Sequence, residues 1–168
     1  MKRMLELIGV AVLALSVTGC SKPSGGAASE PATELVTSQK EPTAVAGAIT
    51  LAYNDRLDEA VALLLEGTAP ASGPVEPLAC LGLSESEIVR AGEAAMTENT
   101  KAGNAARALA RAALAKAAEA RAQGDAAKAA AYAQRVKTMG TELAQDSHNK
   151  LLRMIGQAIE KKAAEAGG

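Results

Sequence analysis

The chain has 168 residues, 48% of them hydrophobic, and its 18 Lys and Arg nearly balance its 19 Asp and Glu, giving a formal net charge of −1. Such a chain has no basic block to neutralise phosphates, so no nucleic-acid partner is expected. It contains no Phe or Trp and only two Tyr, which argues against an aromatic platform that stacks bases or sugars.

The N-terminal segment has the features of a secretory signal. A positively charged start (MKR) precedes a mostly apolar run at residues 7–17, which at 1.5 Å per residue spans about half of a bilayer core. The run ends in VTGC at residues 17–20, which resembles the lipobox of bacterial lipoproteins. The resemblance implies that residues 1–19 are a signal peptide and that the thiol of Cys20 carries a diacylglycerol. The alternative is a plain signal peptide with a chance cysteine.

The resemblance also implies where the mature protein lies. Acyl chains on Cys20 would anchor it to a membrane without spanning it. Ser21 stands where an aspartate favours inner-membrane retention in Gram-negative lipoproteins, so the expected location is the cell envelope, at the outer membrane facing the periplasm. Residues 20–42 are rich in Ser, Gly, Pro, Ala and Glu and cannot offset their ordering entropy by burial, which predicts a disordered tether.

Residues 43–168 are predicted to form an all-α domain of five to six short amphipathic helices in antiparallel hairpins, with a Pro-rich loop at 67–77. Strand signals are almost absent, and 18 of the 32 positions from 102 to 133 are alanine, the best helix former. Few large side chains are available for the core, so modest stability is expected.

Local signals set the expected helix ends. Ser84 with Glu87 forms a capping-box pattern, Gly124-Asp125 reads as a C-terminal glycine followed by an N-cap, and Asn54-Asp55 reads as a turn. Gly103-Asn104 suggests a stop and restart, and Asp146 or Ser147 is expected to cap the last helix. The predicted helices are 44–53, 55–66, 84–98, 104–123, 125–144 and 148–164.

Apolar side chains at helical spacing indicate the buried faces. One stripe steps by three and four residues along the helix at 125–144, and consists of Ala129, Tyr132, Val136, Met139 and Leu143. A second stripe, on the last helix, consists of Leu151, Leu152, Ile155 and Ile159. Residues 57–65 supply a third apolar face.

Two segments resemble the second helices of tetratricopeptide (TPR) hairpins. They are DRLDEAVALLLEG at residues 55–67 and GDAAKAAAYAQRV at residues 124–136. Ala60 and Ala129 occupy the small-residue position and are 69 residues apart, close to two periods of 34. The middle repeat is not recognisable, so a TPR-like architecture and a generic helical bundle both remain open.

No catalytic, metal-binding or cofactor-binding residues are expected. Cys80 lies in the apolar context LACLGL and is expected to be a buried thiol. His148 is the only histidine, and the residues 146–148 (DSH) are expected to form a helix cap, because adjacent residues cannot form a triad relay.

The sequence therefore predicts a membrane-anchored envelope lipoprotein that acts as a non-catalytic helical module for an unidentified protein partner. The alternative is a structural spacer lipoprotein that assembles through its alanine-rich helices. An enzyme with an unrecognised site is the third hypothesis.

Overall fold

The computed structural model describes residues 43–167, and the signal, lipidation and tether predictions for residues 1–42 lie outside this range. Within residues 43–167 the chain forms six α-helices, one short 3-10 helix and no strand, which confirms the all-α prediction. The elements are α1 (Ala44–Tyr53), α2 (Leu57–Glu66), η1 (Ala79–Leu81), α3 (Glu85–Ala91), α4 (Glu93–Ala122), α5 (Ala126–Asp146) and α6 (Lys150–Gly167).

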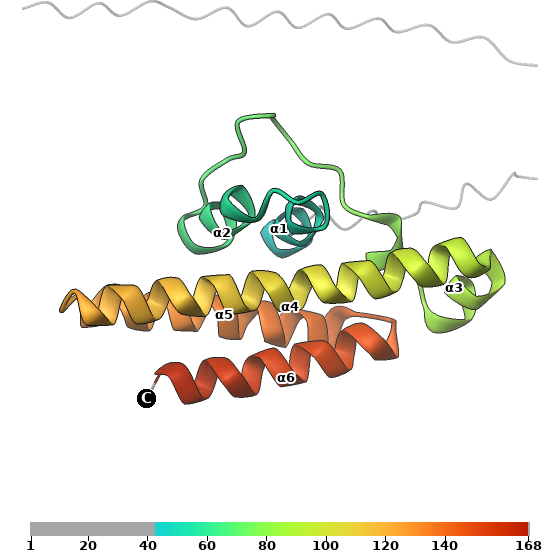
Figure 1. Cartoon of the computed structure of the whole chain (residues 1–168). Coiled ribbons are helices and arrows are strands. Elements are labelled where there is room, and N and C mark those ends of the chain that lie inside the picture. The colour runs from blue at the N-terminus through green and yellow to red at the C-terminus, as the bar shows by residue number, and fades with distance from the viewer. Residues whose placement is uncertain (1–42, 168) are drawn as a thin grey trace, which may run out of the picture. The chain divides into compact units, whose positions relative to one another are not determined.

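Helix α4 is the central element of the described domain (Figure 1). Its 30 residues correspond to a length of about 45 Å. Helices α5 and α6 pack beside it to form a three-helix layer, and the α1–α2 hairpin crosses α4 on its other side (Figure 1). Helix α3 folds back at the N-terminal end of α4 (Figure 1).

Several predicted helix ends are confirmed by their cap geometry. The hydroxyl of Ser84 accepts a hydrogen bond from the backbone N–H of Glu87, whose carboxylate accepts one from the N–H of Ser84 at 2.8 Å. Gly124 has a φ of 83°, a left-handed conformation that favours glycine. The carboxylate of Asp125 accepts a hydrogen bond from the N–H of Lys128 at 2.9 Å, which satisfies one of the free donors at the start of α5.

The predicted break at Gly103-Asn104 is wrong. Helix α4 continues through both residues, and the chain breaks instead at Gly92, where φ is 90° and ψ is −168°. The predicted helices 84–98 and 104–123 are therefore replaced by a short α3 and a long α4. Gly103 lies inside α4 where α6 packs against it: a Cβ atom there would lie 2.7 Å from Cδ1 of Ile155.

The hydrophobic core lies on both sides of α4. Ile49 and Leu51 of α1 are fully buried on one side, and Leu109 of α4 is also fully buried. All five residues of the predicted α5 stripe are buried, as are three of the four predicted for α6: Leu152, Ile155 and Ile159. Leu151 packs at the edge of this core and is half-buried.

Helices α5 and α6 approach each other closely at two glycines. A Cβ atom on Gly140 would lie 2.6 Å from the backbone nitrogen of Glu160, and one on Gly156 would lie 2.5 Å from the backbone nitrogen of Ala144. Real side-chain carbons do not approach backbone that closely, so only glycine fits at these two positions.

Helix α6 is capped by Asn149, not by Asp146 or Ser147 as predicted. The side-chain oxygen of Asn149 accepts a hydrogen bond from the N–H of Leu152 at 3.2 Å. Its side-chain nitrogen donates to the side-chain oxygen of Asn99 in α4 at 2.5 Å. Both amides are buried, so this bond fixes the position of α6 along α4. Asp146, Ser147 and Asn149 are all of residue types that cap helices well, and burial beside Asn99 distinguishes Asn149, which the sequence analysis did not name.

Candidate functional site

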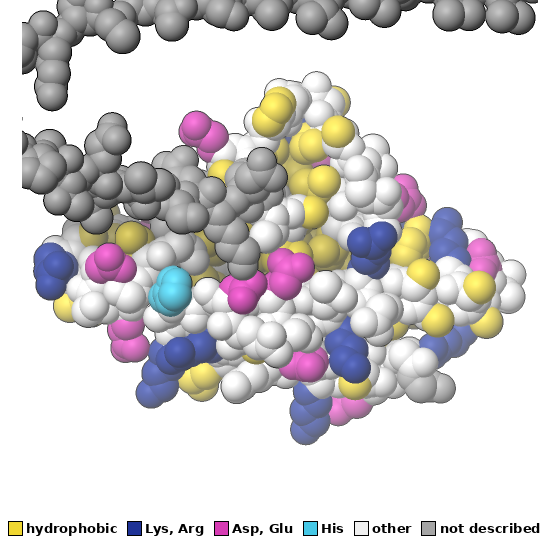
Figure 2. All heavy atoms as spheres, turned by 180° about the vertical axis from the view of Figure 1, so that it is seen from behind, with side chains coloured by type: hydrophobic (Ala, Val, Ile, Leu, Met, Phe, Trp, Pro, Cys, Tyr) yellow, Lys and Arg dark blue, Asp and Glu magenta, His cyan; other side chains and the backbone are white. Residues whose placement is uncertain are grey.

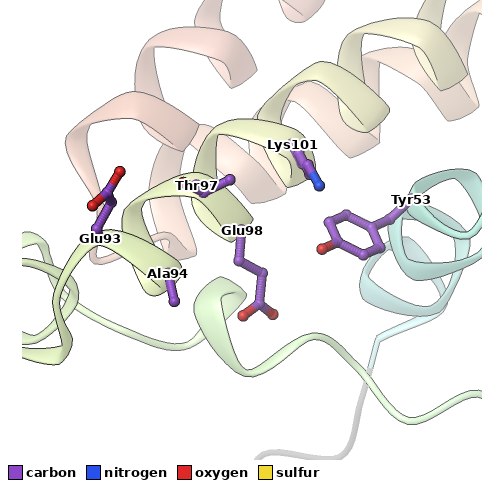
Figure 3. A pocket seen from close by; sticks show the side chains of 6 residues that line it. All are labelled: Tyr53, Glu93, Ala94, Thr97, Glu98 and Lys101. Atoms are coloured by element: carbon purple, nitrogen blue, oxygen red, sulfur yellow. The ribbon is translucent and has the colours of Figure 1, made fainter.

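A hollow of about 560 Å³, open to solvent, lies between the end of α1 and the N-terminal half of α4 (Figure 3). Tyr53 extends from α1 toward Glu98 and Lys101 of α4 (Figure 3). The lining residues are Tyr53, Glu93, Ala94, Thr97, Glu98 and Lys101.

The local structure explains how these side chains come together. Tyr53 is the last residue of α1, and the chain turns away at Asp55, which has a left-handed φ of 59°. On α4, Ala94, Thr97, Glu98 and Lys101 are three or four residues apart, so they lie on one side of the helix. Because α4 begins directly after the break at Gly92, all four of these residues belong to the same helix.

Cys80 lies beside the hollow and confirms the prediction of a buried thiol. Its side chain is 1% exposed. Burial, and then the negative charge of the neighbouring Glu98, raise the pKa of Cys80 to about 11. A thiol with this pKa remains protonated at neutral pH and is a weak nucleophile, so Cys80 serves as part of the packing under the hollow.

The polar groups in the hollow have few partners within the described domain. The side chains of Tyr53 and Lys101 make no hydrogen bond or ion pair with any residue between 43 and 167, and Glu98 interacts with the thiol of Cys80. A phenol, an ammonium and a carboxylate are therefore available to a molecule that covers the hollow. Three or more metal-ligating side chains do not cluster anywhere in the part of the chain that the structure describes.

The DSH segment spans the end of α5 and the start of the turn to α6: Asp146 is the last helical residue, and Ser147 and His148 lie in the turn. The hydroxyl of Ser147 is 3.3 Å from the backbone nitrogen of Asn149 and accepts a hydrogen bond from it. His148 is exposed. The pKa of the Glu87 carboxyl lies below its usual range chiefly because the hydroxyl and the backbone N–H of Ser84 donate hydrogen bonds to it. Ser147 and His148 thus belong to the turn that precedes α6, with Ser147 supporting the cap residue Asn149.

Sequence reasoning did not identify the hollow. The spacing of Thr97, Glu98 and Lys101 on one helix face was readable, but nothing local pairs that face with Tyr53, because the pairing depends on how α1 packs across α4. The predicted lipid site Cys20 lies outside the described residues. None of the helices between residues 43 and 167 is long and apolar enough to cross a membrane.

Comparisons with family models, with curated proteins and with solved structures found no match to this chain.

Proposed function

We propose that this chain is a lipoprotein of the bacterial cell envelope, anchored through lipid on Cys20, whose helical domain binds a protein partner. The single observation that carries the anchor is the sequence VTGC at residues 17–20, placed directly after a short apolar run. Firm anchoring takes more than one acyl chain, which the lipobox chemistry would supply. By the same resemblance, Ser21 supports the outer membrane as the site of attachment.

The hollow supports a role in protein interaction for the domain. Its free phenol and ammonium groups suit hydrogen bonds with a polar or charged surface, and it is open, as a docking site for a helix or loop must be. A small substrate would be poorly enclosed there, because substrate sites bury most of their ligand. The proposed domain is therefore a non-catalytic interaction module.

The packing of the alanine residues favours this role over that of a structural spacer. A spacer that assembles through alanine faces needs those faces to be exposed. In α4 one alanine face is buried inside the domain by its neighbours, at Ala106, Ala110, Ala113, Ala117 and Ala120. The exposed alanines of the same segment, Ala115, Ala118 and Ala122, alternate with the exposed charged residues Lys116, Glu119 and Arg121 and so form no continuous alanine face.

The TPR-like resemblance enters this proposal in a limited form. The two matching segments coincide with α2 and α5, which are the second helices of the hairpins α1–α2 and α4–α5. A middle turn, one period of 34 before Gly124, would fall near residue 90, beside the break at Gly92, but the helices on either side of this break are unequal, with 7 residues in α3 and 30 in α4. We therefore propose two TPR-like hairpins within a helical bundle.

The anchor is tested by labelling cells that produce the full chain with a palmitate analogue. Wild type should incorporate the label, and Cys20→Ser should not. The variant Cys80→Ser serves as the control, because its thiol is buried and should not be lipidated. Equal labelling of wild type and Cys20→Ser would refute the anchor.

The interaction site is tested by placing a photo-crosslinking amino acid at Tyr53 of the full chain in cells. The matched control places it at Gln134, which is exposed on α5 and outside the hollow. We expect one recurring protein adduct from position 53 that position 134 does not give. The same adducts from both positions, or none from either, would refute the hollow as the docking site.

A further inference from the structure

The two parts of the described domain carry opposite charge, although the chain as a whole is nearly neutral. Residues 43–98, which form α1, α2, α3 and the start of α4, contain nine Asp and Glu and two Arg. Residues 99–167 contain twelve Lys and Arg and six Asp and Glu. In Figure 2 the Lys and Arg side chains are spread over the part of the domain below the α1–α2 hairpin, with Asp and Glu side chains among them, while the hairpin carries mainly hydrophobic and some acidic side chains.

Six of these cations form a basic face on α4 and α6. All six are exposed, and none of them takes part in an ion pair with any residue between 43 and 167. The basic face consists of Arg107 and Arg111 of α4 and Lys150, Arg153, Lys161 and Lys162 of α6. Acidic residues in this part of α6 are few: Glu165, which is exposed, and Glu160, which is half-buried.

The packing of α4 against α6 places the two helices' cations side by side. Gly103 of α4 faces Leu151 and Ile155 of α6, and Arg107 and Arg111 follow Gly103 by about one and two turns. Farther along, the guanidinium of Arg121 donates to the backbone oxygen of Ala166 at 2.7 Å, so the two helices run parallel and stay in contact.

An apolar side chain lies among these cations. Met154 is 58% exposed and is one of three large hydrophobic residues exposed in the described domain. It directly follows Arg153 and lies about two turns before Lys161. Helix α6 is thus buried on one side, through Leu152, Ile155 and Ile159, and cationic with a protruding methionine on the other. An amphipathic helix with a basic polar face is typical of segments that lie on anionic membranes.

We propose that the basic face docks on anionic lipid headgroups of the membrane to which the chain is anchored. This inference rests in part on the proposed anchor, because a tethered domain meets the membrane at high effective concentration and even weak headgroup contacts then suffice. Each Lys or Arg near an anionic surface adds to the attraction, and the attraction falls off within a Debye length. Met154 inserts between the headgroups.

Docking in this way would orient the domain. Lys101, in the hollow, and Gly103, against α6, are two residues apart on α4, a rotation of about 200° around the helix. The hollow therefore lies on the side of α4 away from α6. Arg111 of the basic face, ten residues after Lys101, lies about 80° from it around α4. With the basic face on the membrane, the hollow would therefore open alongside the lipid surface and not into it, where a protein partner can reach it.

The test uses the chain from residue 20 onward with Cys20→Ser, so that no acyl chain contributes to binding. Sedimentation is measured with vesicles of phosphatidylcholine alone and of phosphatidylcholine with 30% phosphatidylglycerol, at about 0.05 M and 0.5 M salt. Binding should require the anionic lipid and weaken at high salt. The double variant Lys161→Glu with Lys162→Glu should bind anionic vesicles roughly tenfold more weakly or worse.

The matched control, Arg90→Glu with Arg135→Glu, makes the same change in net charge on α3 and α5, outside the basic face, and should bind more tightly than the Lys161/Lys162 variant. Circular dichroism verifies that both variants are folded. Equal binding to neutral and anionic vesicles, or an equal loss of vesicle binding in the two double variants, would overturn the proposal. The first outcome would favour an acidic protein, not a membrane, as the partner of the basic face. Because this chain carries no lipid, its behaviour is independent of whether Cys20 is acylated.

Discussion

The close contact between α5 and α6 predicts that Gly156→Ala destabilises the domain although alanine is the better helix former. A Cβ atom on Gly156 would lie 2.5 Å from the backbone nitrogen of Ala144, 2.6 Å from the backbone oxygen of Gly140 and 2.8 Å from Cβ of Leu143. Two of these are backbone atoms inside a helix, which cannot rotate out of the way. The two helices must therefore move apart by about 1 Å to restore ordinary contact distances.

The magnitude follows from two opposing terms. Replacing glycine by alanine inside a helix gains about 1 kcal/mol from backbone propensity. Separating the helices by about 1 Å forfeits a quarter to a half of the dispersion energy of the side chains around the contact, and overpacking of this kind costs about 1–3 kcal/mol or more. With rigid backbone on the far side the cost lies at the upper end, so we expect a net loss of about 1–2 kcal/mol. For a domain of this size that lowers Tm by roughly 3–10 °C.

Two other glycines provide matched controls for the same substitution. At Gly103 the new methyl group meets the end of the Ile155 side chain at 2.7 Å, which can change rotamer, so Gly103→Ala should be close to neutral. At Gly47 the nearest atom is Cδ2 of Leu63 at 3.5 Å, an ordinary contact, so Gly47→Ala should stabilise by up to about 1 kcal/mol.

The measurement is urea and thermal unfolding followed by circular dichroism at 222 nm. The expected order of stability is Gly47→Ala, then wild type and Gly103→Ala, then Gly156→Ala. If Gly156→Ala is as stable as wild type or more stable, the close approach of α5 and α6 does not limit the packing and the reasoning fails.

Three further changes test single contacts by the same unfolding measurements. Gly124→Val should cost about 1 kcal/mol or more, because a β-branched residue tolerates the left-handed turn between α4 and α5 poorly; an unchanged Tm would mean that the turn is not formed. Asn149→Ala should cost about 2 kcal/mol or more, since it removes a cap and leaves a buried amide unpaired, whereas Asp125→Ala, which removes only an exposed cap, should cost about 1 kcal/mol; equal losses would contradict the buried bond. Tyr132→Phe should cost about 1 kcal/mol, because its hydroxyl donates to the carboxylate of Glu66 at 2.7 Å while the ring stays packed; no loss would show that this link between α2 and α5 does not contribute.

The features that the sequence predicted correctly are those coded by neighbouring residues. Large apolar side chains at spacings of three and four reveal the buried face of α5, with Tyr132, Val136 and Met139 at its centre. The caps at Ser84 and Asp125 depend on contacts three residues apart. These contacts join residues three or four positions apart, so they form within one helix and do not depend on how the helices pack together.

The features that were missed depend on residues distant in sequence. A glycine inside a helix costs about 1 kcal/mol, so Gly103 looks like a break until α6 is seen packed against it. Gly92, which does interrupt the helix, has a φ of 90° and nothing within 4 Å of its Cβ position, and neither property can be read from the sequence around it. The hollow likewise depends on α1 crossing α4, which brings Tyr53 next to Glu98. In an alanine-rich chain, small residues carry much of the packing information, and their partners cannot be read from spacing alone.

If the basic face docks on lipid as proposed, the two sides of α6 have separate roles, and substitutions on them should have separable effects. Stability comes from the buried side: Leu152, Ile155 and Ile159, the backbone contact at Gly156, and the Asn149 cap. Lys161 and Lys162 form no ion pair within the described residues, so reversing their charge should change the free energy of unfolding by no more than about 0.5 kcal/mol while it weakens binding to anionic vesicles roughly tenfold or more. Gly156→Ala should do the opposite below its Tm, lowering stability while the folded fraction still binds vesicles, because the basic face is intact. If reversing Lys161 and Lys162 unfolded the domain, those cations would be part of its packing and could not serve as a free membrane-docking surface.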